Sequence, residues 1–166
     1  MNVRSIAALG LLLAATPSGL SAKTFALPDA KPVVTIDLPD GWAPEAIEKG
    51  ARATSPDASV YVAFQVSDAR DTDRAIADAV TFFAANGIRI DPATQKRLDA
   101  KLNGMDLIDV TWDGADANGP TKAALSVILV TDAKIGVLTY RGSDAGEATY
   151  AEALKAIVDS IEPVDR

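Results

Sequence analysis

The region that most constrains the fold spans residues 95 to 141, where four extended segments follow one another with only short connectors between them. The segments are residues 95–102, 105–112, 122–131 and 135–141, and the connectors are residues 103–104, 113–120 and 132–133. Connectors of this kind join antiparallel neighbours. The third segment is almost continuously apolar, so we expect a central strand covered on both faces. The first segment alternates charged and apolar residues, as an edge strand does.

The remaining segments add three strands and two helices. Alternating apolar residues predict strands at residues 33–38 and 59–66 and a shorter one at 51–54. Apolar residues at helical spacing predict helices over residues 72–86 and 145–161. The order is thus βββαββββα. We expect an α+β domain in which an antiparallel sheet of about six to seven strands is sandwiched by the two helices.

The N-terminal segment has the pattern of a secretory signal peptide, with a basic residue near the start, an apolar stretch over residues 5–15 and small residues before the cleavage point. The apolar stretch is shorter than the about 20 residues that cross a bilayer. We predict removal of residues 1–22 by cleavage after Ala22, with cleavage after Ala26 as the alternative. Residues 23–166 then form a single periplasmic or secreted domain without membrane insertion, and without Cys there is no lipobox.

The composition excludes several classes of function. The 166 residues include no His and no Cys, so Ser-His-Asp triads, Cys-His pairs, His-ligated zinc and thiolate redox chemistry are ruled out. The sequence contains no nucleophile elbow and no phosphate-binding glycine loop, and we expect no cofactor. A net charge of −7 repels phosphate backbones and anionic headgroups, so neither nucleic acid nor a membrane surface is an expected partner.

Carboxylates remain as candidate functional groups, and the densest group of them lies in residues 113–119. Asp113, Asp116 and Asn118 resemble the start of a calcium-binding loop, because hard cations need closely spaced oxygen ligands. The register fails, since a loop with Asp116 at position 3 has Leu125 at position 12, where calcium loops have Glu. A hairpin turn is the favoured interpretation, and the three residues are kept as metal candidates.

A second acidic group, made of Asp68, Asp71 and Asp73, lies at the start of the helix expected over residues 72–86. Acids at a helix N-terminus are stabilised by the helix dipole and by unpaired backbone N–H groups. Capping, with Asp71 as the N-cap, is therefore the favoured interpretation. The three acids are also candidates for contact with a ligand or partner.

The aromatic residues have a structural and a functional interpretation. Trp42 and Trp112 have the ring area of a stacking platform for a sugar, but Trp42 follows a turn and Trp112 continues the apolar phase of its strand. Packing in the core or at its edge is favoured for both, and Trp42 is kept as a candidate for ligand contact. Phe82 and Phe83 are likewise expected in the core.

Four structural motifs are spread over the chain beyond the leader. They are the turn Pro39-Asp40-Gly41-Trp42, Gly104 before the strand at 105–112, the turn at Asp132, and the helix end Asp159-Ser160-Ile161-Glu162-Pro163. In these motifs the chain resembles the PsbP-like superfamily, whose members include small bacterial envelope proteins of unknown role. The resemblance implies an antiparallel sheet sandwiched by helices, and it implies no catalytic residues.

Two hypotheses about function follow. The favoured one is a non-enzymatic envelope protein that binds a partner protein or a small ligand on its sheet or in the loops at one end. The alternative is a carboxylate-dependent hydrolase of cell-envelope or carbohydrate material, with or without bound Ca²⁺ or Mg²⁺. Such an enzyme requires two carboxylates about 5 to 9 Å apart across a cleft.

Overall fold

The computed structural model describes residues 21–164, and all but the last two residues of the predicted leader lie outside this range. Its helices are α1 (Thr72–Ala85) and α2 (Asp144–Asp159). Its strands are β1 (Ala22–Leu27), β2 (Val34–Pro39), β3 (Glu45–Ile47), β4 (Gly50–Thr54), β5 (Val60–Asp68), β6 (Arg89–Ile90), β7 (Lys96–Leu102), β8 (Met105–Asp116), β9 (Gly119–Thr131), β10 (Lys134–Gly142) and β11 (Glu162–Pro163).

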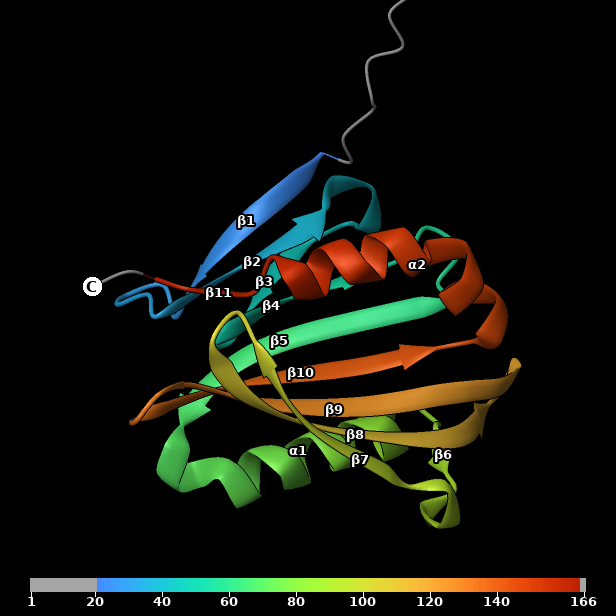
Figure 1. Cartoon of the computed structure of the whole chain (residues 1–166). Coiled ribbons are helices and arrows are strands. Elements are labelled where there is room, and N and C mark those ends of the chain that lie inside the picture. The colour runs from blue at the N-terminus through green and yellow to red at the C-terminus, as the bar shows by residue number, and fades with distance from the viewer. Residues whose placement is uncertain (1–20, 165–166) are drawn as a thin grey trace, which may run out of the picture.

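The strands form two antiparallel sheets (Figure 1). The larger sheet has eight strands in the order β3-β4-β5-β10-β9-β8-β6, with β7 paired to β8, and the smaller sheet has the order β1-β2-β11. The larger sheet carries α1 on one face, and α2 lies with the smaller sheet on the other face. Neither helix of the described chain is long and apolar enough to cross a membrane.

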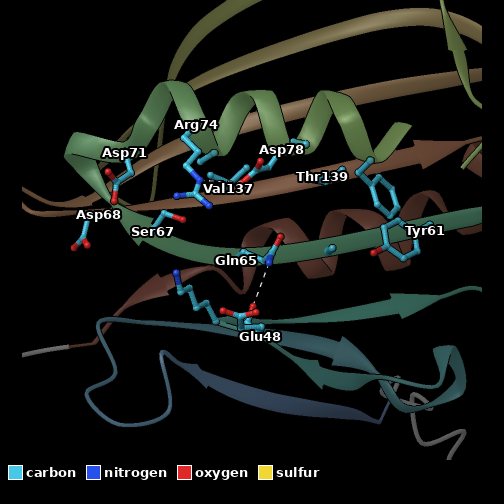
Figure 2. A pocket seen from close by; sticks show the side chains of 15 residues that line it. Glu48, Tyr61, Gln65, Ser67, Asp68, Asp71, Arg74, Asp78, Val137 and Thr139 are labelled. Carbon is cyan, nitrogen blue, oxygen red and sulfur yellow. Dashed lines mark hydrogen bonds and ion pairs between the residues drawn. The ribbon is translucent and has the colours of Figure 1, made fainter. Parts of the chain in front are cut away.

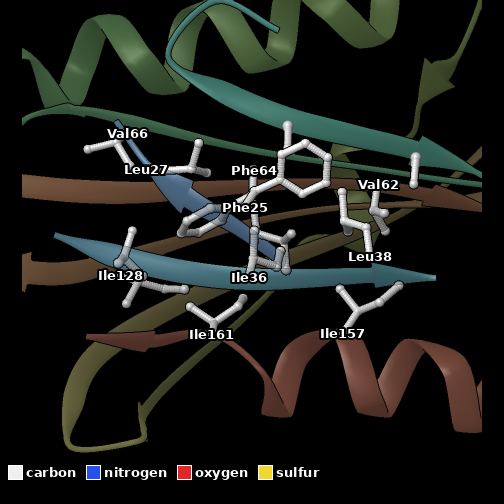
Figure 3. Close-up of a cluster of buried hydrophobic side chains, with 14 of the residues drawn as sticks. Phe25, Leu27, Ile36, Leu38, Val62, Phe64, Val66, Ile128, Ile157 and Ile161 are labelled. Atoms are coloured by element: carbon white, nitrogen blue, oxygen red, sulfur yellow. The ribbon is translucent and has the colours of Figure 1, made fainter. Parts of the chain in front are cut away.

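Every second side chain of β5 points into the main core. The even-numbered residues from Val60 to Val66 are at most 3 % exposed and pack against the smaller sheet and α2 through side chains that include Ile36 and Ile157 (Figure 3). Phe64 also fills the space over Gly136 of β10, where a Cβ atom would lie 2.4 Å from the ring. Glycine is therefore required at that position for close packing.

The C-terminal end of α2 is tied to two other elements. The Ser160 hydroxyl accepts a hydrogen bond of 2.9 Å from the backbone N–H of Asp37 in β2. The Asn103 amide, in the turn between β7 and β8, donates to the carbonyls of Asp159 and Ile161 at 3.0 and 2.9 Å. The motifs at residues 103–104 and 159–163 thus hold the helix end, the smaller sheet and the β7–β8 hairpin together.

The α+β class, the antiparallel pairing and the sandwich between two helices confirm the prediction from sequence. β7 lies at an edge, and β9 has buried side chains on both faces, with Leu125 toward α1 and Ile128 toward the main core. The strand count is higher than predicted because β1, β3, β6 and β11 are short or lack a clear alternation. The first predicted strand, β2, belongs to the smaller sheet.

The loop predicted at residues 113–120 is mostly strand. β8 continues to Asp116 and β9 begins at Gly119, which leaves only residues 117–118 between them. The Asp and Gly residues there have turn propensity, but pairing with Lys122 and its neighbours keeps the segment extended. Cross-strand pairing therefore overrides local preference at this hairpin.

The position of β1 gives a prediction about processing. Phe25 and Leu27 are buried in the main core and β1 pairs with β2 along its whole length. Cleavage after Ala22 removes only the Ala22–Pro39 pair and retains the rest of this pairing, whereas cleavage after Ala26 removes Phe25. We expect the intact mass of the exported protein to correspond to a chain that begins at Lys23.

The matching stability measurement is urea denaturation of two chains that begin at Lys23 and at Leu27. The shorter chain should lose about 3 kcal/mol or more of unfolding free energy, because it lacks a buried phenylalanine. Equal stability of the two chains would contradict the structural role given to β1.

A second prediction concerns Asn103, which has a φ angle of +48°. Asn103→Gly keeps the left-handed backbone and loses both hydrogen bonds, so it should lower the unfolding free energy by about 1 kcal/mol. Asn103→Ala adds backbone strain and should cost about 2 kcal/mol. Urea denaturation of both variants tests this order, and a wild-type midpoint for Asn103→Gly would show that the hydrogen bonds contribute nothing.

Candidate functional site

A groove lies between α1 and the part of β5 that the helix leaves uncovered (Figure 2). Its floor consists of the odd-numbered residues from Tyr61 to Ser67 in β5, together with Val137 and Thr139 of the adjacent strand β10. Glu48 and Lys49, between β3 and β4, form the wall opposite the helix. The cavity volume is ≈ 340 Å³, at the small end of the range for ligand-binding pockets.

Small side chains keep the groove open. Ala63 on the floor and Ala75 and Ala79 on α1 all line it. The residues of α1 that face the groove lie on one side of the helix; they are Arg74, Ala75, Asp78, Ala79 and Phe82, and Asp71, which precedes the helix, lines the groove as well. Larger side chains at the alanine positions would fill the space between the helix and the sheet.

The floor offers polar groups at its base. Thr139 is 6 % exposed, and its hydroxyl makes no hydrogen bond with any residue of the range 21–164, so it is open to solvent in the groove that it lines. The Gln65 side chain donates from Nε2 to the carbonyl of Glu48 at 3.1 Å, which leaves its Oε1 as an acceptor. Ser67 adds a second hydroxyl to the lining.

An aromatic pair closes one end of the groove. The rings of Tyr61 and Phe82 stack with centroids 5.0 Å apart and an interplanar angle of 21°. Burial raises the pKa of Tyr61, while the charges of Arg52 and Arg141 act in the opposite direction. Glu45, which pairs with Arg52 at 2.6 Å, raises the pKa of Tyr61 as burial does, and the phenol is neutral.

The opposite end of the groove is acidic. Asp68 binds Lys134 at 2.7 Å and lies 3.8 Å from Arg70. The hydrogen bond from Lys134 is the main reason that the pKa of Asp68 is lowered, and the charge of Lys49 adds to the effect. Asp68 thus remains ionised, and Asp71 lies beside it on the rim (Figure 2).

The three acids predicted near the start of α1 have different roles. Asp71 stands at the N-cap position, but its carboxylate makes no capping hydrogen bond, so the predicted side-chain cap is wrong. The reason is its backbone, with φ −100° and ψ +16° instead of the extended conformation of a usual N-cap. Asp71 and Asp68 line the groove, whereas Asp73 does not.

The metal candidates do not converge on one point. Asp113 and Asp116 are three residues apart in β8, so their side chains point to opposite faces of the sheet. The Asp116 carboxylate accepts a hydrogen bond of 2.7 Å from the backbone N–H of Asn118, as in an Asx turn. Between residues 21 and 164, no three acidic side chains lie close enough together to hold a metal ion.

Both tryptophans pack within the protein. Trp42 is buried in the main core, where its ring meets Tyr150 edge-on at a centroid distance of 5.2 Å, so it has no free face for a ligand. Trp112 is partly buried beside the α1 face of the sheet and donates from Nε1 to Gln95 at 3.1 Å. Phe83 is buried as predicted, but the prediction for Phe82 was incomplete because its ring lines the groove.

Most groove residues were missed from sequence. The available signal was the polar face of β5, where Tyr61, Gln65 and Ser67 alternate with the buried valines. A helix packed squarely over that face would favour apolar residues at these positions. The polar alternation therefore indicates incomplete cover, although it does not identify Thr139 or the wall at Glu48.

Comparison with known proteins gives structural matches only. No protein-family model and no curated protein matches the sequence. The solution structure of cyanobacterial PsbP (CyanoP) from Synechocystis sp. PCC 6803 is similar with a TM-score of 0.58 and 11% identity, covering 93% of this chain and 100% of that one.

LpqN of Mycobacterium tuberculosis, described as involved in cell envelope biogenesis, matches with a TM-score of 0.55 and 12% identity over 87% of this chain and 92% of its own. A protein from Bacteroides thetaiotaomicron matches with a TM-score of 0.55 and 15% identity, over 87% of this chain and 49% of that one. The fold is therefore PsbP-like, which confirms the resemblance seen in the sequence. At these identities the likeness concerns the fold alone.

The Asp68–Lys134 pair gives a pH prediction. The pKa of Asp68 is lowered from its ordinary value of 3.8, so the pair contributes stability above about pH 4 and loses it as the pH falls through the lower folded pKa. The difference in unfolding free energy between wild type and Asp68→Asn should be largest at neutral pH and shrink below about pH 4. Urea denaturation across this pH range checks it, with Asp73→Asn as control. A difference that grew on acidification would contradict the pairing.

Proposed function

We propose that this chain is a non-enzymatic binding protein of the cell envelope and that the groove beside α1 receives its ligand. The observation that carries the proposal is the Thr139 hydroxyl, which faces the groove from a largely buried residue, is open to solvent there, and has no protein partner within residues 21–164. Ligand pockets typically combine apolar walls with a few such polar groups, which fix the orientation of the ligand. A ligand atom that hydrogen-bonds to Thr139 would satisfy it.

Another hollow, of ≈ 840 Å³, is larger but less suited to specific binding. It lies between the β1–β2 and β9–β10 connections and is lined mainly by proline and aliphatic side chains, with Lys31, Thr131, Asp132 and Lys134 as its polar residues. The groove beside α1 is preferred because it combines a hydroxyl without a protein partner in residues 21–164, an amide oxygen and charged rims within one cavity.

Binding without catalysis is favoured by the chemistry of the groove. A carboxyl group that acts as a general acid needs a pKa raised toward neutrality. The pKa of Asp68 is shifted in the opposite direction by Lys134. Asp78 is not an isolated carboxyl group either, because Arg74 lies 3.8 Å from it. No observation on residues 21–164 specifically favours the hydrolase alternative.

The envelope location is inferred from two independent features. The N-terminal segment has the pattern of a signal peptide. A protein with the same fold, LpqN, is described as involved in cell envelope biogenesis. We infer that the mature domain works outside the cytoplasm.

A matched pair of alanine variants tests the groove. Ala75 lines it, while Ala77 is exposed on the same helix and does not. Ala75→Trp should fill the groove and abolish capture of the native ligand or partner by the purified domain, and Ala77→Trp should leave capture unchanged. The measurement is crosslinking capture from the exporting cell, followed by mass spectrometry, with circular dichroism to confirm folding. Equal capture by both folded variants would show that binding occurs elsewhere.

A further inference from the structure

We propose that the ligand of the groove is an extended segment of a partner polypeptide, with a lysine or arginine seated at the acidic end beside Asp71. This inference rests on the proposed function of the groove. It adds the chemical class of the ligand and the direction in which the ligand lies.

The shape of the groove favours an extended chain. Its floor follows β5 from Tyr61 to Ser67, and this strand length is roughly 20 Å at about 3.3 Å per residue. A volume of only ≈ 340 Å³ over that length makes the groove narrow. A peptide of about six extended residues has the same length, whereas a compact ligand would fill one end only.

The polar groups of the floor suit a peptide backbone. A bound peptide brings both N–H donors and carbonyl acceptors, each of which needs a partner when it leaves water. The Thr139 and Ser67 hydroxyls offer both donor and acceptor capacity, and the free Oε1 of Gln65 offers an acceptor. These three side chains are distributed along the floor and do not cluster at one point (Figure 2).

The charges on the rim define a direction. Asp68 is already paired with Lys134, and Arg74 with Asp78. Within residues 21–164 the carboxylates of Glu48 and Asp71 make neither a hydrogen bond nor an ion pair, and Lys49 is the remaining cation of the lining. At the other end, Arg141 lies opposite Tyr61 in the pairing of β10 with β5, and Arg52 is paired with Glu45 at 2.6 Å. A basic side chain is therefore favoured near Asp71 and disfavoured near Tyr61.

Selection from a random six-residue peptide library on beads tests this inference with the mature domain, residues 23–166. Sequencing of the bound pool should show lysine and arginine enriched at one end of the peptides. The Glu48→Gln, Asp71→Asn double variant should reduce that enrichment, because both carboxylates line the groove and neither has a partner among residues 21–164. Asp73→Asn should retain it, since Asp73 lies at the same helix end but outside the groove.

The strongest selected peptide is then measured by fluorescence anisotropy. Removing each groove carboxylate should weaken its affinity about two- to fivefold, as for exposed ion pairs, and added salt should weaken it further. Ala75→Trp should abolish binding and Ala77→Trp should not. Enrichment of acidic or purely apolar peptides, or no enrichment, overturns the inference. If native capture remains sensitive to Ala75→Trp in that case, the proposed function still stands; peptides bound equally well by Ala75→Trp overturn both.

Discussion

The two-residue alternation of β5 is the constraint on which the rest of the structure depends. Its even positions, from Val60 to Val66, hold the main core together by packing against β2 and α2. Its odd positions, from Tyr61 to Ser67, form the floor of the groove. Because a strand has exactly two faces, a shift of register by one residue would expose the core and fill the groove with valines. The stability of the fold and the floor of the proposed binding groove are thus specified by the same strand.

The two faces of the larger sheet are covered in different ways. On the core face, α2 is fixed at its end by hydrogen bonds that involve Ser160 and Asn103 and by the strand pairing of β11 with β2. On the other face, α1 packs through Ala79 against β9 and β10 and through Phe83 near β6. This contact leaves β5 partly uncovered. The groove is a consequence of where α1 sits, and alanines on the facing side of the helix keep it open.

Sequence patterns predicted the long elements because each carries its own periodicity. The strands β5, β7, β9 and β10 and both helices belong to this group, whereas β3, β6 and β11 exist only because a neighbour pairs with them. The site was harder to predict. Ala63 has the character of a core residue in sequence, and its place in a groove depends on the offset of α1. Asp71 was selected as a helix cap, which its backbone angles do not allow.

The placement of charge is compatible with a stable domain and with selective binding in the proposed groove. The floor residue Ala63 and the buried Thr139 carry no charge, so the folded domain bears no desolvation cost for an ion there. The charged groups Glu48, Asp71 and Arg74 stand on the rims, where water solvates them in the free protein. A bound segment would exclude part of that water and strengthen each rim interaction. The rim charges would then discriminate between ligands in the bound state, and they would lower the stability of the unbound domain only a little.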